Sequence, residues 1–564
     1  METLRAFYVL VWPFWNGLHA MRLWLLLAAA LICELGFVQV SVWINHWNKS
    51  FYDALAEFDV HLVQPLLLQY IAFMIAAVIL IVVGNWFGKK LSFNWRNEMT
   101  ASFQKRWMQN HTHYRLRFHG EPDNPDQRIA EDISLLAEQS VMLVRNLVLN
   151  IARLSAFVAI LWSISGIQTI YLGNVEMNIH GYLVWIALCY AVTATALIHL
   201  IGRDLQPLNV ERQHREADYR ATLLRARDHG EQIAFHRGEA AEIDRMDRRF
   251  EKIRRNWHRL IFQELKVECF SATQMRIAWF IPIVATLPLY LGKAITFGDM
   301  MQAQSAFSSV LAGFSWFLNY YSRISEWSAV VTRLAEFRKS MEDVTHLQSL
   351  ATVPPHEQRQ LTVRDLTVSK PCGAVLLNKV NLTIERGNWL LVEGASGTGK
   401  TTFLRALAGL WPYHSGTIAI ADNVMFLPQT PYVPLDDARW TLSYPRRTPF
   451  ADAELRCALA AVGLSHLSEM DEGSRDTLSG GERQRLCFAR ILLHKPAIVI
   501  ADEPTSHLDT YASIGLLRVL KQRLPNISFI AVCHQPEVVS EFESSIVLQD
   551  RTLSARIMER RHSA

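Results

Sequence analysis

Four apolar runs in the first half of this 564-residue chain are each long enough to cross a lipid bilayer. They lie near residues 23–44, 66–87, 146–165 and 182–201. A bilayer core offers no partners to backbone N–H and C=O groups, so a run of about 20 apolar residues inside it must form an α-helix. One such run could be a buried core helix of a soluble domain, but four in one chain favour a membrane domain.

Two further spans are predicted near residues 272–291 and 297–318. The first contains Arg276 and two prolines, and the second contains Asp299, so both are less apolar than the other four. With six spans, residues 1–337 are predicted to form an all-α transmembrane domain.

Lysine and arginine are distributed unevenly between the loops that join these runs. Residues 89–145 and 203–266 are rich in both, whereas residues 45–65 and 166–181 contain only Lys49. Cytoplasmic loops carry such an excess of positive charge, so the two basic loops are predicted to be cytoplasmic. Basic segments could also bind nucleic acid, but their position beside membrane spans explains them better, and the net charge is only +4.

The last third of the chain reads as a second domain. Residues 338–360 have mixed charge and contain Pro354-Pro355, which predicts a linker, and residues 361–564 follow as the domain itself. Within it, residues 361–366 and 380–384 alternate between apolar and polar side chains. This alternation predicts strands of a small antiparallel sheet.

A phosphate-binding pattern, G-x-x-x-x-G-K-[ST], lies between a predicted strand at residues 389–393 and a predicted helix at residues 402–408. Its glycines let backbone amides curl around phosphate groups, and the helix N-terminus adds positive potential. The predicted nucleotide-binding residues are Gly394, Ala395, Ser396, Gly397, Thr398, Gly399, Lys400, Thr401 and Thr402.

Asp502 and Glu503 end a second apolar run, residues 497–501. Lys400 is expected to reach the β- and γ-phosphates, while the Thr401 hydroxyl and Asp502 are the expected Mg²⁺ ligands. Glu503 is then placed to polarise an attacking water. A strand that ends in two carboxylates is usually only a solvated strand end, but together with the phosphate-binding pattern it predicts a catalytic site.

The pentapeptide Leu478-Ser479-Gly480-Gly481-Glu482 lies between these two motifs. The three motifs in this order resemble the α/β P-loop ATPase domain of ABC transporters. That resemblance implies ATP and Mg²⁺ as cofactors. It implies Gln429 as a nucleotide-binding residue and Mg²⁺ ligand that senses the ion, and His534 as a catalytic histidine at the γ-phosphate. It also implies nucleotide contacts from Ser479, Gly480, Gly481 and Glu482.

In that family, ATP lies between the P-loop of one ATPase domain and the pentapeptide of another. This chain carries one set of each, so the resemblance implies a homodimer with two-fold symmetry. One position departs from the family pattern. Lys370 stands where many members have an aromatic residue that stacks on adenine.

Two cytoplasmic patches narrow the resemblance. Residues 124–132 are similar to a stretch of the peroxisomal fatty-acyl half-transporters and their bacterial relatives. Residues 216–220 and 231–239 are similar to the loop of that group that docks against the ATPase domains. The coupling residues that this similarity implies are Glu131, Asp132, Glu216, Arg220 and Glu231. The alternative is that these are only charged faces of helices that extend into the cytoplasm.

Residues 314–334 resemble the membrane domain of the SbmA/BacA peptide transporters. Fusion of such a domain to an ABC ATPase is the YddA-type arrangement. The resemblance implies a six-span, exporter-like (type IV) fold, a bacterial inner membrane and no soluble binding-protein partner. Bacterial relatives are associated with uptake of cobalamin and antimicrobial peptides.

Glu34 lies in the middle of the first span, where a charge is costly unless it faces water or a partner. It is therefore a candidate for the substrate cavity, with a structural ion pair as the equal alternative. The leading hypothesis for the whole chain is an ATP-driven importer of bulky hydrophilic solutes or peptides, embedded in membrane lipid. An acyl-CoA or lipid transporter and an exporter of peptides remain alternatives.

Overall fold

The computed structural model describes residues 2–17, 20–118, 124–172, 175–345, 359–395, 397–420, 423–434, 437–469, 478–549 and 552–557. The chain divides into two compact units. One is helical and comprises Met1–Gln104 and Asn124–Phe337, and the other comprises Lys105–Asp123 and Arg338–Ala564. The predicted membrane domain, residues 1–337, therefore loses an internal segment, which packs with the second unit.

Five helical stretches in the described residues are long and apolar enough to span a membrane. They are Ala20–Ala56, Val60–Phe118, Pro125–Ser165, Tyr182–Asp228 and Glu239–Leu291, and each contains one of the first five predicted spans. The helices that carry these spans are α2 (Ala20–Ala56), α3 (Val60–Met108), α6 (Ile133–Ser165), α7 (Tyr182–Gly202) and α10 (Glu239–Leu291), preceded by α1 (Glu2–Trp15).

The sixth predicted span, residues 297–318, is interrupted in the structure. Helix α11 (Phe297–Phe314) is capped by Ser315, and α12 (Trp316–Thr345) begins at the next residue. Helix α11 is less apolar than the other spans because it lies inside the bundle, where Ala303, Phe307 and Val310 are fully buried. The predicted linker, residues 338–360, begins within α12, which continues to Thr345, and residues 346–358 lie outside the described residues.

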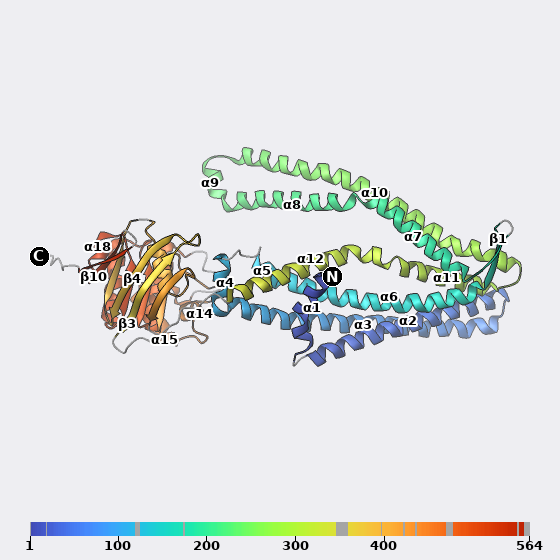
Figure 1. Ribbon diagram of the computed structural model, residues 1–564, viewed down its shortest axis with the longest axis horizontal. Helices are drawn as coiled ribbons and strands as arrows, with labels where there is room; N and C mark the ends of the chain where they lie inside the picture. The colour runs from blue at the N-terminus through green and yellow to red at the C-terminus, as the bar shows by residue number, and fades with distance from the viewer. Residues whose placement is uncertain are drawn as a thin grey trace. The chain divides into compact units, whose positions relative to one another are not determined.

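The membrane helices are longer than a bilayer is thick. The 49 residues of α3 rise about 74 Å at 1.5 Å per residue, against about 30 Å of hydrocarbon. Helices α8 (Leu205–Asp228) and α10 run side by side and are joined by the short α9 (Gly230–Phe235), as Figure 1 shows. The strands β1 (Ile167–Leu172) and β2 (Val175–His180) form a hairpin between α6 and α7.

The second unit contains two sheets. A six-stranded sheet has the order β11-β10-β5-β9-β8-β7, with all neighbouring pairs parallel except β10 with β11. A three-stranded antiparallel sheet has the order β4-β3-β6, and the predicted pairing of its first two strands is confirmed. The strands are β3 (Arg359–Ser369), β4 (Val375–Glu385), β5 (Trp389–Glu393), β6 (His414–Ile420), β7 (Val424–Leu427), β8 (Ile498–Asp502), β9 (Ser528–Val532), β10 (Ser544–Gln549) and β11 (Thr552–Ile557).

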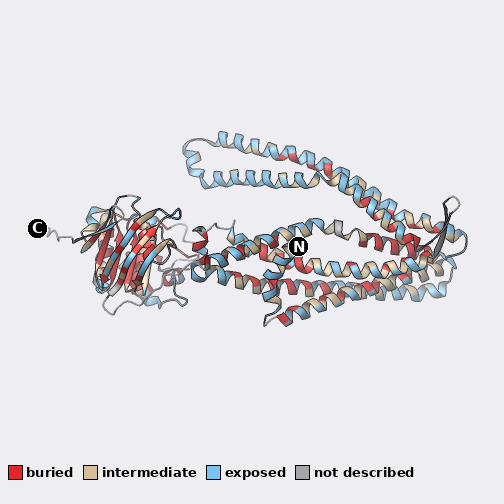
Figure 2. Cartoon of the chain, viewed as in Figure 1, coloured by how far each residue is buried: buried red, intermediate tan, exposed pale blue. Residues whose placement is uncertain are grey.

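The central strands of the larger sheet are nearly continuous apolar runs, as expected for a parallel sheet that is buried on both faces. Every residue of β8 and β9 is buried. Figure 2 shows buried residues gathered in the strands of this unit. The sequence therefore places Asp502, at the carboxyl end of β8, at the edge of the apolar core. The helices of this unit are α13 (Lys400–Leu407), α14 (Ala438–Ser443), α15 (Asp452–Ala461), α16 (Gly480–His494), α17 (Thr510–Arg523) and α18 (Pro536–Val539).

Candidate functional site

The predicted phosphate-binding loop joins β5 to α13, as the sequence indicates. Gly394 adopts a φ of 152°, and a Cβ there would lie 2.9 Å from the carbonyl oxygen of Leu548, so only glycine fits. Gly399 adopts a φ of 98° just before α13 begins. The carbonyl of Ala395 accepts a hydrogen bond from the Thr398 hydroxyl at 2.9 Å. Ser396 lies outside the described residues, Gly397 lies within the loop, and Thr402 lies in the first turn of α13.

Lys400 is buried at the start of α13, with 9% of its surface exposed. Its Nζ donates hydrogen bonds to the carbonyl oxygens of Gly394 at 2.7 Å and Ala395 at 3.2 Å. The ammonium group is therefore held on the concave side of the loop. This position places a fixed positive charge where phosphate oxygens would lie.

Thr401 and Asp502 come together across the end of β8. The Thr401 hydroxyl hydrogen-bonds the Asp502 carboxylate, although burial dominates and raises the pKa of Asp502 above its usual range. A hydroxyl and a carboxylate are oxygen ligands of the kind that Mg²⁺ prefers. The pair therefore fits a Mg²⁺ ion, whose positive charge would offset the cost of keeping Asp502 ionised.

Glu503 contacts two other predicted site residues, Gln429 and His534. Its Oε2 accepts a hydrogen bond from Gln429 Nε2 at 3.1 Å, and its Oε1 lies 3.4 Å from His534 Nε2. Gln429 follows β7, Glu503 follows β8 and His534 follows β9, so three strand ends bring the side chains together. The φ of Glu503 is +49°, a costly conformation for a residue with a side chain, and such strain clusters at functional sites.

Cys533 lies beside this cluster. Burial, followed by the negative charge of Glu503, raises the pKa of its thiol to about 12. The thiol therefore stays neutral and adds no second negative charge next to Glu503.

The pentapeptide forms the start of α16. Ser479 caps this helix, and Glu482 Oε2 accepts hydrogen bonds from the Ser479 backbone N–H at 2.8 Å and hydroxyl at 2.9 Å. These bonds lower the pKa of Glu482. His466 Nε2 lies 3.1 Å from the other carboxylate oxygen. The contacts of Glu482 thus shape the helix N-terminus, which leaves Ser479, Gly480 and Gly481 as its outer surface.

Sequence reasoning missed Gln484. Its Nε2 donates to the Ser506 hydroxyl at 3.0 Å, and its Oε1 accepts from the His507 backbone N–H at 2.9 Å. A Cβ on Gly480 would lie 2.9 Å from the His507 ring, so the pentapeptide and the segment after Glu503 pack without a gap. Helical spacing could have indicated Gln484, because it lies one turn after Gly480.

The two neighbouring acidic residues Glu131 and Asp132 have different environments. Asp132 is 2% exposed and forms ion pairs with Arg128 at 2.8 Å and with Arg333 at 2.6 Å. Glu131 is exposed and accepts a hydrogen bond only from Gln127 within the described part of the chain. Glu131 and Asp132 lie in the π-helical turn η3 (Arg128–Asp132), which follows α5 (Pro125–Gln127) and leads directly into α6. Asp132 therefore fastens this turn to α12.

The second predicted coupling patch is a solvated surface. Glu216 and Arg220 are exposed on α8, and Glu231 is exposed on α9. On the same hairpin, Phe235 is 79% exposed although it is apolar. The exposure of these residues fits both a solvated helix face and a surface that docks on the ATPase domain.

A further contact lies within the second unit, around Trp411. The short helices η1 (Gln109–His111), α4 (Thr112–Arg115) and η2 (Leu116–Phe118) belong to the second unit, and Phe118 of η2 packs against its apolar core. Phe118 lies edge-on to Trp411 at 5.0 Å, and its carbonyl accepts a hydrogen bond from the Tyr413 hydroxyl at 3.1 Å. Trp411 also donates to the Ser369 carbonyl at 2.9 Å, next to the exposed Lys370.

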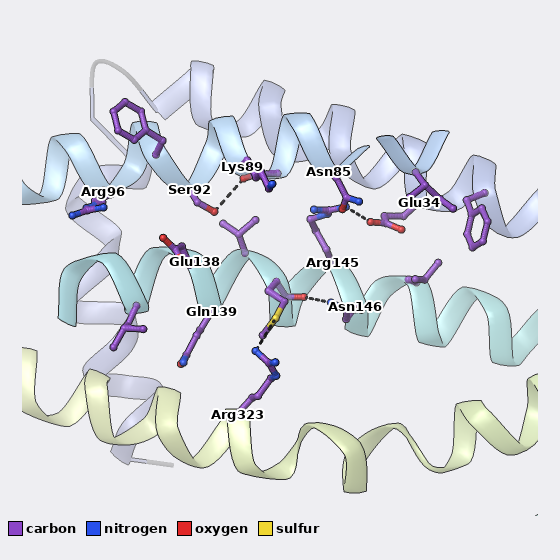
Figure 3. A pocket seen from close by; sticks show the side chains of 18 residues that line it. Glu34, Asn85, Lys89, Ser92, Arg96, Glu138, Gln139, Arg145, Asn146 and Arg323 are labelled. Carbon is purple, nitrogen blue, oxygen red and sulfur yellow. Dashed lines mark hydrogen bonds and ion pairs between the residues drawn. The ribbon is translucent and has the colours of Figure 1, made fainter. Parts of the chain in front are cut away.

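Glu34 borders a cavity of about 730 Å³ between α2, α3, α6 and α12. Figure 3 shows that Arg145 of α6 points toward Glu34 and Asn85. Arg145 forms an ion pair with Glu34 and donates a hydrogen bond to Asn85 Oδ1 at 3.1 Å. Glu34 is thus both part of a structural ion pair and part of the cavity wall.

Comparisons with known proteins agree with the motifs. The family described as "ABC transporter transmembrane region 2" matches residues 15–287, and the family described as "ABC transporter" matches residues 377–506. The chain is 32% identical to the inner membrane ABC transporter ATP-binding protein YddA of Escherichia coli, covering 95% of this chain and 96% of that protein.

More distant relatives cover a similar share. The human lysosomal cobalamin transporter ABCD4 is 25% identical over 95% of this chain and 92% of its own length. The chloroplastic ABC transporter D family member 2 of Arabidopsis thaliana is 27% identical over 99% and 88%. The structure of a bacterial Atm1-family ABC exporter with ATP bound has a TM-score of 0.71 at 16% identity, covering 96% of this chain and 95% of that one, and supports the predicted fold.

Proposed function

Because this chain belongs to the ABC transporter family, with a membrane domain and an ATPase domain on one polypeptide, we propose that it imports bulky hydrophilic solutes or peptides. It is a membrane protein that couples ATP hydrolysis to transport. We also propose the direction of transport, the cargo and the role of each residue in the ATP site.

One observation carries the catalytic part of the proposal: Gln429 and His534 both contact the carboxylate of Glu503. In our mechanism Glu503 is the general base that takes a proton from the attacking water. Gln429 and His534 orient that carboxylate, and Lys400 neutralises phosphate charge. Thr401 and Asp502 would hold Mg²⁺, which supplies Lewis-acid stabilisation of the phosphates when bound.

The proposed active form is a homodimer. Half-transporters of this family generally work as dimers, and the chain carries one P-loop, on α13, and one pentapeptide, on α16. In a two-fold arrangement, Ser479, Gly480 and Gly481 of one copy would complete the ATP site of the other. ATP binding would then close the ATPase domains, and hydrolysis would let them separate.

The proposed coupling elements are the segment at Phe118, the turn that Asp132 holds and the α8–α9–α10 hairpin with Glu216, Arg220 and Glu231. Closure of the ATPase domains would move these segments and change which side of the membrane cavity is open. The name of the Escherichia coli relative supports a bacterial inner membrane as the location. We infer no nucleic-acid partner and no soluble binding protein.

Cargo is proposed by analogy. ABCD4 is named a lysosomal cobalamin transporter, which supports a bulky hydrophilic cargo such as cobalamin, and the SbmA/BacA-like features support peptides. The second candidate is an acyl-CoA or lipid transporter, which the relation to the D family favours. An exporter of peptides is the third, because the fold of an exporter does not fix the direction of transport.

The test is uptake of labelled cobalamin and of a labelled proline-rich peptide by cells that lack the gene. The cells are complemented with the wild-type chain or with Glu503→Gln. Uptake of either compound with the wild type alone supports an ATP-driven importer. Equal uptake in both strains would remove import of these cargoes and leave acyl-CoA transport or export as the leading function.

A further inference from the structure

The cavity that contains Glu34 has a charge pattern that the family assignment does not explain. Its lining residues Lys89 and Arg96 follow the apolar run at residues 66–87 on α3, whereas Glu34 lies inside the run at residues 23–44. The cavity therefore extends from within the predicted membrane-spanning part of the bundle toward its predicted cytoplasmic end. A cargo that binds from the cytoplasm, or that is released to it, would contact these side chains.

Glu34 contributes no free negative charge to this cavity. Its carboxylate is paired with Arg145, and the two side chains are only 15% and 13% exposed. Arg145 is fixed by packing as well, because a Cβ on Gly88 would lie 2.2 Å from its Nη1. Glycine at this position therefore makes room for the guanidinium group. The pair is a support for the cavity wall rather than a binding site for a cation.

The remaining charges of the lining are mainly positive. Lys89, Arg96 and Arg323 form no ion pair within the described residues, and Glu138 is the one other carboxylate in the lining. Within the described residues, the hydrogen-bond acceptors of these two arginines are uncharged. Arg96 donates to the Ala130 carbonyl at 3.3 Å, and Arg323 lies 3.7 Å from the Met142 sulfur.

An unsatisfied polar side chain lies on the same wall. Gln139 is 7% exposed, and its Oε1 has no hydrogen-bond partner among the described residues. In Figure 3, Gln139 of α6 and Arg323 of α12 lie on facing sides of the space between these helices. Buried polar groups are normally paired, so this unpaired oxygen marks a polar stretch of the wall. An amide oxygen accepts hydrogen bonds, so it would pair with a donor on the cargo, and any attraction for an anion comes from the neighbouring cations alone.

We propose that this cavity binds the anionic part of the cargo, such as a carboxylate or phosphate group, through Lys89, Arg96 and Arg323. The inference rests on the proposed transport function, because it names the cargo class for that function. Uncompensated cations in a partly enclosed cavity attract an anion and repel a second cation. Anionic solutes are thus favoured as cargo, and arginine-rich peptides are disfavoured.

An anionic lipid head group has the same chemistry and could reach the cavity from the inner leaflet. The experiment therefore uses the purified full-length transporter in nanodiscs of phosphatidylcholine alone and in nanodiscs that also contain phosphatidylglycerol. Hexaglutamate, hexaserine and hexalysine peptides, each with the same uncharged fluorophore, are the probes. Fluorescence anisotropy reports their binding without any need for ATP hydrolysis.

Hexaglutamate is expected to bind in phosphatidylcholine nanodiscs at least about tenfold more tightly than hexalysine. Arg323→Gln and Lys89→Gln should each weaken that binding about tenfold, as loss of a charge-assisted hydrogen bond does. Arg323→Lys keeps the charge and should retain most of the binding. Lys90→Gln is the matched control, because Lys90 is outside the lining and stacks on Trp86 at 4.5 Å.

Equal affinity for hexaglutamate and hexalysine, or hexaglutamate affinity that none of the variants changes, overturns the proposal. Competition by phosphatidylglycerol that Arg323→Gln abolishes supports the same anion site and identifies a lipid as one source of the anion. If uptake fails while charge-dependent binding persists, the proposed importer function is wrong and the anion site stands. A thermal melting curve for each variant excludes loss of fold.

Discussion

Glu503 occupies a backbone conformation that an ordinary strand end does not require. The turn that gives it a φ of +49° is held by hydrogen bonds from its N–H to the Val532 carbonyl at 3.1 Å and from the Ser506 N–H to its own carbonyl at 3.3 Å. The result is a carboxylate that points at Gln429 and His534. We therefore expect ATP hydrolysis to depend on the Glu503 carboxylate and ATP binding not to depend on it.

Glu503→Gln should therefore lower ATP turnover at least about 100-fold while ATP binding is retained, because a general base contributes about 10²–10⁴-fold. Phosphate release and binding of a fluorescent ATP analogue measure the two effects separately. Glu537→Gln, which changes an exposed carboxylate on α18, should leave both unchanged. ATP turnover by Glu503→Gln at the wild-type rate would contradict the assignment of the base.

Glu482 gives a prediction about pH. The Ser479 N–H and hydroxyl stabilise its ionised form and lower its pKa, so the cap adds stability at neutral pH. That stability should be lost only in acid, as the pH falls through the lowered pKa. Glu482→Ala should cost about 1 kcal/mol near pH 7. This cost should shrink as the pH falls through the lowered pKa, because the wild-type carboxylate then loses the charge that the Ser479 hydrogen bonds stabilise. Thermal unfolding of the full chain across this pH range measures the difference, and a constant difference would contradict the role of the cap.

At the scale of elements, one buried carboxylate joins the first turn of α6 to α12. Asp132→Asn leaves Arg128 and Arg333 without their partner and should lower the free energy of unfolding by about 3 kcal/mol. The adjacent Glu131→Gln changes an exposed side chain and should cost less than about 0.5 kcal/mol. Thermal melting of both variants in detergent provides the comparison. Equal melting temperatures would show that the ion pairs do not hold the two elements together.

The contact between α3 and α6 depends on Gly88 in a similar way. A methyl group there would displace the Arg145 guanidinium and break its pair with Glu34, so Gly88→Ala should cost about 1–3 kcal/mol. Gly515→Ala, where no heavy atom lies within 4 Å of the new Cβ, should be neutral or slightly stabilising within α17. Melting temperatures that rank these variants in the opposite order would contradict the packing of Arg145 against α3.

The sequence was informative wherever the chemistry is local. The strand, loop and helix around Lys400 follow from neighbouring residues, as do the β3–β4 pairing and five of the spans. The partner of Glu34 lies 111 residues away, so no periodicity could point to Arg145. The extent of α11 was also hard to predict, because a helix packed inside a bundle needs less apolar surface than one that faces lipid. The different environments of Glu131 and Asp132 appear only when α12 is in place.

The proposed ATPase cycle needs two copies of the chain. In the proposed dimer, the P-loop before α13 and the pentapeptide at the start of α16 would each supply half of an ATP site, and the family generally works as dimers. A variant with a defective P-loop and a variant with a defective pentapeptide are each inactive as homodimers, because both sites of each dimer are damaged. A mixed dimer collects both defects in one site and leaves the other intact.

The most direct test is therefore ATP hydrolysis by purified dimers that combine Lys400→Ala in one copy with Ser479→Arg in the other. Two different affinity tags isolate the mixed dimers from either homodimer. The account predicts ATP turnover of up to about half the wild-type rate in the mixed dimer, since one of its two sites is intact, and almost none in the homodimers. Turnover in the mixed dimer no higher than in the homodimers would contradict ATP sites shared between two copies.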